Sequence, residues 1–111
     1  MNLYNELQTQ VDLLQKSLEQ LRKTGSAYAE AERDYKILLR QEVLKLRDEG
    51  TAIGVISIIC YGIPSVAESR FRRDVCEATY KANQEAINTY KLKIRLLESQ
   101  LQREWDNQKY E

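Results

Sequence analysis

The side chains that could perform chemistry in this sequence are few, and none of them matches a catalytic pattern. Histidine is absent from all 111 residues, which removes the usual base of a catalytic triad and the commonest metal ligand. Glu32 and Glu42 could be read as paired carboxylates near one face of a helix, but a register shift after Gly25 moves them outward. The four glycines are scattered and form no phosphate-binding loop. The sequence therefore predicts a protein that is not an enzyme, with no cofactor and no metal.

Two cysteines, Cys60 and Cys76, are the thiols of this chain. They do not have the spacing of a CxxC motif, and one lies in an apolar run while the other lies on a predicted helix. We expect both to be reduced, structural and not bridged to each other. Cys60 is interpreted as a small hydrophobic side chain rather than a reactive thiol.

Three arginines at the basic start of a predicted helix are the candidates for contacting phosphate: Arg70, Arg72 and Arg73. The segment 55–73 has a short apolar helix, a glycine and then a basic helix, an order that resembles a helix-turn-helix DNA reader. The match is incomplete, because Ile58 and Glu68 stand where such motifs place a small and an apolar residue. Glu68 and Asp74 also offset the positive charge. DNA contact is therefore an alternative hypothesis, and a solvated charged face is the simpler interpretation.

The composition predicts an all-α protein. Charged residues make up 31% and hydrophobic residues 42%, with one proline and four glycines, a profile typical of helical and coiled-coil proteins. Acidic and basic residues number 17 each, so the charge does not demand nucleic acid. The most apolar window, Ile53 to Ile63, is too short to span a membrane, and the first residues lack the pattern of a signal peptide. We expect no membrane contact and a cytoplasmic location.

Apolar residues spaced alternately by three and four predict a first helix over about residues 2–49. The row consists of Leu7, Val11, Leu14, Leu18 and Leu21, and then of Tyr28, Ala31, Tyr35, Leu38, Leu39, Val43 and Leu46. Gly25 between the two parts costs a helix about 1 kcal/mol relative to alanine. We expect the helix to continue through Gly25, with a break there as the alternative. Asn2 is expected to cap its start and Gly50 to end it.

A short apolar connector helix is expected over about residues 52–61, capped by Thr51 and closed by Gly62. A strand is the alternative for this β-branched segment, but a single strand would have no partner in this chain. The apolar side chains exceed what one end of a hairpin can cover, which makes them a candidate protein interface. The candidate residues are Ile53, Ile56, Ile59, Tyr61 and Ile63. The simpler alternative is that they cap the hairpin core.

A second long helix is expected over about residues 65–107, where Ser65 and Glu68 have the spacing of a capping box. Its apolar row consists of Phe71, Val75, Ala78, Ala82, Ala86, Ile87, Tyr90, Ile94, Leu97, Leu101 and Trp105. With the first helix it predicts one domain over residues 1–111, a long antiparallel, coiled-coil-like helical hairpin.

The hairpin prediction also gives a register. Folding at the connector should bring together residues whose numbers sum to roughly 108–112. Leu14 should then face Ile94 or Leu97, and Leu21 should face Ile87 or Tyr90. Large side chains at Tyr28 and Tyr35 are expected against the small residues Ala78, Ala82 and Ala86.

Nearly the whole chain resembles a group of small uncharacterised helical proteins from prophages of Gram-positive bacteria. The resemblance rests on the residues Leu46-Arg47-Asp48-Glu49-Gly50-Thr51, Tyr80-Lys81, Gln84-Glu85-Ala86-Ile87-Asn88, Ile94-Arg95-Leu96-Leu97-Glu98 and Arg103-Glu104-Trp105. The group has no settled activity, so the resemblance implies no site residues. It implies a phage protein in a bacterial host, encoded near recombination functions and acting beside DNA-processing proteins.

The sequence as a whole predicts a non-enzymatic interaction or scaffold protein that self-associates. Two paired helices leave wide apolar rows uncovered, so we expect a homo-oligomer, with a dimer favoured, held partly by the connector helix. A phage or host protein is the other expected partner. The alternative is a DNA-associated accessory factor that uses the basic start of the second long helix.

Overall fold

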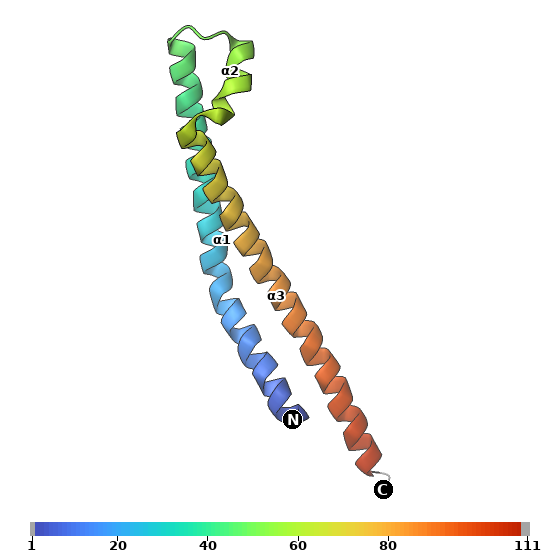
Figure 1. Ribbon diagram of the computed structural model, residues 1–111. Coiled ribbons are helices and arrows are strands. Elements are labelled where there is room, and N and C mark those ends of the chain that lie inside the picture. The colour runs from blue at the N-terminus through green and yellow to red at the C-terminus, as the bar shows by residue number, and fades with distance from the viewer. Residues whose placement is uncertain (1, 110–111) are drawn as a thin grey trace. The chain divides into compact units, whose positions relative to one another are not determined.

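The computed structural model describes residues 2–109, and every regular element in that range is a helix, which confirms the predicted fold class (Figure 1). Helix α1 spans Leu3–Asp48 and helix α2 spans Ile53–Ile59. A short 3-10 helix, η1, follows over Cys60–Gly62, and helix α3 spans Pro64–Lys109. The two long helices pack against each other, and the chain reverses direction in the connector between them.

The chain divides into two compact units, each of which contains a segment of α1 and a segment of α3. The connector unit is Thr24–Tyr80 and includes α2 and η1. The terminal unit consists of the residues up to Lys23 together with those from Lys81 onward. Each unit is described by itself.

Both predicted ends of α1 are confirmed. The Oδ1 atom of Asn2 accepts a hydrogen bond from the backbone N–H of Tyr4 at 2.8 Å, which satisfies a donor that the first helical turn leaves unpaired. At the other end Gly50 has a φ of 86°, a left-handed conformation that glycine adopts without a Cβ clash. The N–H groups of Gly50 and Thr51 then donate to the carbonyls of Arg47 and Leu46, at 3.1 and 3.0 Å. This pair of bonds is the Schellman motif.

The expected cap of the connector helix is wrong. The residue that precedes α2 is Ala52, in an extended conformation with φ −62° and ψ 140°, and no side chain caps the helix there. Thr51 instead completes the end of α1. The connector is also α2 followed by η1, rather than one helix over residues 52–61.

The expected capping box of α3 is also wrong, because α3 begins one residue earlier, at Pro64. Proline suits the first helical position, since it lacks the N–H that would be unpaired there. The carbonyl of Ile63 accepts from the N–H of Ala67 at 2.9 Å, so Ser65 lies inside the first turn and does not pair with Glu68 as a box. Ile63 is extended, with φ −63° and ψ 126°, as its place before proline requires.

Helix α1 continues through Gly25, as expected. The glycine has a packing reason, because a Cβ atom built there would lie 3.0 Å from Cε1 of the Tyr80 ring. The rings of Tyr28 and Tyr80 also lie near each other, with centroids 6.1 Å apart and an interplanar angle of 34°. Gly25 therefore lets an aromatic side chain of α3 approach the backbone of α1.

The predicted apolar row of α3 is wrong in the connector unit. Phe71 is 63% exposed and Val75 is also exposed, whereas Val66 is completely buried. The row that faces α1 continues from Val66 through Arg73 and Tyr80, seven residues apart and thus on one helix face. Because this row includes polar positions, a count of apolar residues selects the outer face instead.

The predicted register holds, but one set of predicted neighbours does not. In the connector unit the Arg73 guanidinium lies 4.6 Å from the ring centroid of Tyr35, and those two residue numbers sum to 108. Tyr28 and Tyr35 therefore pack against Tyr80 and Arg73, and not against Ala78, which is exposed. Ala82, expected in the same place, is exposed as well.

In the terminal unit the expected neighbours are confirmed. Leu14 and Ile94 line one groove, and Leu21 and Ile87 line another.

Candidate interaction surfaces

Helix α2 turns a narrow face inward and a wider apolar face to solvent. Ile56 is 6% exposed, and Cys60, four residues later on the same face, is buried. On the opposite side Ile58 is 78% exposed. We call the exposed apolar residues of α2 and η1 the α2 surface: Ile53, Val55, Ile58, Ile59 and Tyr61.

The structure divides the five residues that were predicted as an interface. Ile53, Ile59 and Tyr61 are exposed, as an interface requires, but Ile56 is buried and Ile63 is half-buried. The alternative interpretation, that the connector caps the hairpin core, therefore applies to Ile56. Val55 and Ile58 belong to the same apolar run but were not among the candidate interface residues, and both lie on the solvent face. The signal was available, because Ile56, Cys60 and Ile63 form the row of spacing four and three that defines the inner face.

The three candidate DNA-contacting arginines all have partners within the connector unit. The Nη1 atom of Arg72 donates to Asp34 Oδ2 at 3.1 Å. Arg73 donates twice to Asp74, at 3.0 and 2.8 Å, and lies over the Tyr35 ring. The third, Arg70, has its guanidinium 5.5 Å from the ring centroid of Tyr61.

These contacts shift two pKa values. Hydrogen bonds from Arg72, and next from Arg33, lower the pKa of the Asp34 carboxyl below its ordinary value of 3.8. The hydrogen bond to Asp74 raises the pKa of Arg73. Each arginine that lies next to a carboxylate already has its charge partly neutralised, so the contacts favour a structural role over phosphate binding.

The two glutamates considered as paired carboxylates lie apart. They are ten positions apart on one helix, a rise of about 15 Å, and each has a nearby lysine. Glu32 pairs with Lys36 and Glu42 with Lys45, both at 3.7 Å. Across residues 2–109, no three Cys, Asp or Glu side chains gather in a way that could hold a metal ion. Cys60 and Cys76 are free thiols, as expected.

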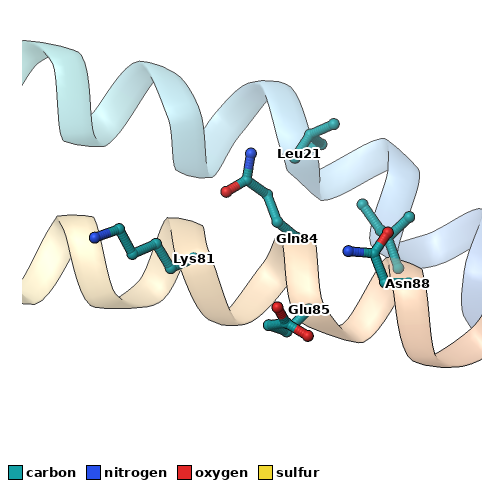
Figure 2. Close-up of a pocket in the computed structure, with 6 residues that line it drawn as sticks. Leu21, Lys81, Gln84, Glu85 and Asn88 are labelled. Carbon is teal, nitrogen blue, oxygen red and sulfur yellow. The ribbon is translucent and has the colours of Figure 1, made fainter.

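The terminal unit carries two open grooves between α1 and α3 beside Leu14 and Leu21, and a third that is lined by Glu6, Gln10, Lys93, Leu96 and Leu97. The first is lined by Leu21, Lys81, Gln84, Glu85, Ile87 and Asn88 (Figure 2). In this view Gln84 extends towards α1, whereas Glu85 points away from it. The second groove is lined by Leu14, Lys91, Ile94, Arg95 and Glu98. Both grooves have an apolar floor between charged or amide side chains.

None of the helices within residues 2–109 has the length and apolar content that crossing a membrane requires. Comparisons with protein-family models, with curated proteins and with solved structures found no match to this chain. The argument for self-association therefore rests on the chain's own surfaces.

Proposed function

We propose that this chain is a non-enzymatic interaction or scaffold protein that self-associates, and that the α2 surface is one contact between copies. The observation that carries the proposal is the ratio of buried to exposed apolar side chains. Six residues form the buried core of the described chain, while fifteen large hydrophobic residues are exposed. Single exposed hydrophobic residues are ordinary, but an adjacent group of them usually marks an interaction site.

The amount of exposed surface supports the same proposal. The chain exposes 8440 Å². A folded monomer of its mass, 13.0 kDa, is expected to expose about 6,300 Å². The difference, about 2,000 Å² per chain, exceeds the roughly 800 Å² that each partner contributes to an interface of standard size.

Light scattering of the purified chain at high micromolar concentration tests the proposal. We expect a mass of at least a dimer. A wild-type chain that stays monomeric would overturn the proposal.

A variant tests the α2 contact itself. Ile53→Lys combined with Ile58→Lys places two charges on the α2 surface and should lower the mass without loss of helicity. Ile56 is unsuitable for this purpose because it is buried, and replacing it would disrupt the packing of α2. Ile37→Lys combined with Leu44→Lys, at two exposed apolar positions of α1 in the same unit, is the matched control and should leave the mass unchanged. An unchanged mass in the double variant would remove the α2 surface from the assembly.

We further propose a phage or host protein as a partner and the cytoplasm of a bacterial host as the location. Both proposals rest on the resemblance to prophage proteins. Isolation of the tagged chain from an infected or lysogenic host, with the Ile53→Lys and Ile58→Lys variant as the control, would test them.

A further inference from the structure

We propose that the terminal unit binds a second copy of itself in antiparallel orientation through the N-terminal half of α1. This inference rests on the proposed self-association and adds a second, separate contact to it. The contact row on α1 consists of six apolar residues: Tyr4, Leu7, Val11, Leu14, Leu18 and Leu21. We call it the α1 row.

Helix α3 covers only one edge of the α1 row. The backbone carbonyl of Ser17 accepts a hydrogen bond from Asn83 Nδ2 at 3.0 Å, and Gln10 lines a groove with Leu97. The polar residues Gln10 and Ser17 therefore lie towards α3, where a coiled coil would normally place apolar side chains. The apolar residues that follow each of them are turned outward, with Val11 39% and Leu18 44% exposed.

The α1 row is complementary to itself when one copy is reversed. Its spacings are three, four, three, four and three, which read the same in both directions. A copy related by a two-fold axis between residues 12 and 13 therefore places Tyr4 opposite Leu21 of the second copy. The same axis places Leu7 opposite Leu18, and Val11 opposite Leu14. Every apolar position then meets an apolar position, as an isologous interface requires.

Charges are sparse along this row. The positions that flank it on the α3 side and on the other side are mostly uncharged: Gln8, Gln10, Gln15 and Ser17. Most charged residues of the same segment lie on other faces of α1: Glu6, Asp12, Lys16, Glu19 and Lys23. Arg22, four residues after Leu18, is the charged residue that lies on the face of the row, at its C-terminal end. Depletion of charge at the centre of a surface is the compositional mark of a protein interface.

The two grooves of the terminal unit lie beside the α1 row. Leu14 and Leu21 line them from α1. Val11 and Leu18 precede these leucines by three residues, so they lie on the same helix face next to the grooves. Side chains of a second copy that enter such grooves would pack as knobs into holes. Figure 2 shows the residues of α3 that line the first groove.

Two of the three charged residues of α3 that line the second groove fit the same two-fold axis, whereas the third, Arg95, lies close to the axis and would meet Arg95 of the second copy. Lys91 and Glu98 both line the groove that Leu14 and Ile94 share, and the midpoint between Lys91 and Glu98 is next to Ile94. Because Ile94 lies across from Leu14, this midpoint is within about one residue of the level of the axis on α1. The antiparallel copy therefore brings Lys91 near Glu98 of the second copy, twice in each pair. Such complementary charges fix orientation more than they add affinity.

The available area is sufficient for a dimer. About 20 residues of helix span about 30 Å, and two helices side by side are about 20 Å wide. Each copy then contributes about 600 Å², and the pair buries about 1,200 Å², at the lower end of the range of specific interfaces. With the α2 surface on the other unit, each chain would have two contacts and assemble beyond a dimer.

The test starts from the chain in which Ile53→Lys and Ile58→Lys have removed the α2 contact. We expect this chain to remain a dimer in analytical ultracentrifugation. Adding Val11→Glu and Leu18→Glu should raise its dissociation constant on the order of a hundredfold, because four charges then enter the apolar row. The mass of the wild-type chain tests whether the chain self-associates at all. The mass of the chain without the α2 contact tests only the contact of the terminal unit. A monomer in this background, with an oligomeric wild type, would overturn the inference and leave the proposed function standing.

The matched control is Leu92→Glu with Leu96→Glu in the same background. Both leucines are exposed and lie two residues from Ile94, about 200° around the helix from it. This control makes the same change in charge and replaces two exposed apolar side chains on the other face, so it should remain a dimer. Helicity measured by circular dichroism should be equal in the two variants. Dissociation of the control alone, or of both variants to the same extent, would contradict the α1 row.

A charge reversal tests the orientation with exposed residues whose replacement does not threaten folding. Lys91→Glu alone and Glu98→Lys alone should each weaken the dimer several-fold. An equimolar mixture of the two variants should recover wild-type affinity, because the mixed antiparallel pair restores opposite charges at both contacts. In a parallel pair like charges would already meet in the wild type, so neither single variant would weaken the dimer and the mixture would bind more tightly than the wild type. Failure of the mixture to exceed either variant alone would reject the antiparallel arrangement.

Discussion

The connector unit and the terminal unit are built from the same two helices, yet they differ in how much they bury. Five of the six buried core residues of the described chain lie in the connector unit: Ala31, Tyr35, Ile56, Cys60 and Val66. The terminal unit holds Ile87. Two of the five come from α2 and η1, the elements that the terminal unit lacks. A third packed segment is therefore what turns a two-helix seam into a core.

The polar contacts between the helices differ in kind. In the connector unit Asp34 and Tyr35 of α1 each contact an arginine of α3. In the terminal unit Asn83 bonds to the backbone at Ser17. Because the terminal unit buries fewer apolar side chains than the connector unit, it is the unit to which apolar burial by a second copy would add most.

The largest expected effect is at the core of the connector unit. Val66→Asp puts a carboxylate at a completely buried position and should cost at least about 3 kcal/mol of unfolding free energy. Ala67→Asp is the control, because residue 67 is exposed and near the start of α3, where an acidic residue is tolerated. Denaturant unfolding measures both. Similar losses in the two variants would contradict the assignment of the core to this unit.

A smaller effect is expected in the terminal unit. Leu14→Asp should cost about 2 kcal/mol, because Leu14 is half-buried and the charge can remain partly hydrated. Thr9→Asp, at an exposed position, should change the free energy of unfolding by less than about 0.5 kcal/mol. If Leu14→Asp costs as much as Val66→Asp, the terminal unit has a core as complete as that of the connector unit.

Gly25→Ala should leave the free energy of unfolding almost unchanged, because two opposite effects cancel. Alanine favours a helix over glycine by about 1 kcal/mol, but its Cβ would lie 3.0 Å from the Tyr80 ring. The same substitution in a Tyr80→Ala background should therefore stabilise by about 1 kcal/mol relative to that background. A double-mutant cycle measures the coupling. Additive effects would show that the ring moves aside without cost.

The smallest expected effect is the contribution of Asp34 to the pH dependence of stability. Its pKa is lowered in the folded chain, so its contribution is complete above the ordinary pKa of the unfolded carboxyl. That contribution is lost as the pH falls through the lowered value. Asp34→Asn should therefore lose less stability than the wild type between neutral pH and pH values below about 4. Thermal melts across this range compare the two, and parallel curves would contradict a role for the Arg72 pair.

The ends of the long helices could be predicted from sequence because each depends on local chemistry. Asn2 has a side-chain acceptor within reach of the first turn, and Gly50 adopts a φ that other residues avoid. Thr51 was misassigned to the following helix because a threonine after a helix-ending glycine fits two roles equally well. The sequence pattern cannot choose between them without the position of the next element.

The sequence could not show which face of α3 packs against α1 in the connector unit, because the helix has two rows of residues with coiled-coil spacing. The outer row begins with Phe71 and Val75, and the inner row contains Val66 and Arg73. Hydrophobicity alone favours the outer row. The inner row is selected by what α1 presents to it, because the Tyr35 ring accommodates the Arg73 guanidinium as a cation–π partner. In the terminal unit Ile87 is buried and Ile94 is half-buried, so there the predicted row faces α1, except at Ala82 and Trp105, which are exposed.

The buried thiol of Cys60 can be used to measure how often α2 detaches from the rest of the connector unit. α2 has seven residues and is too short to persist as a helix once it leaves the surface that Ile56 and Cys60 cover. A thiol reagent in water can reach Cys60 only when that segment lifts away, so its labelling rate under native conditions reports how often α2 detaches. An assembly that covers the α2 surface would hold the segment down and slow the labelling. The labelling rate then reports how much of the α2 surface is covered in a dilute or concentrated sample, without an engineered label.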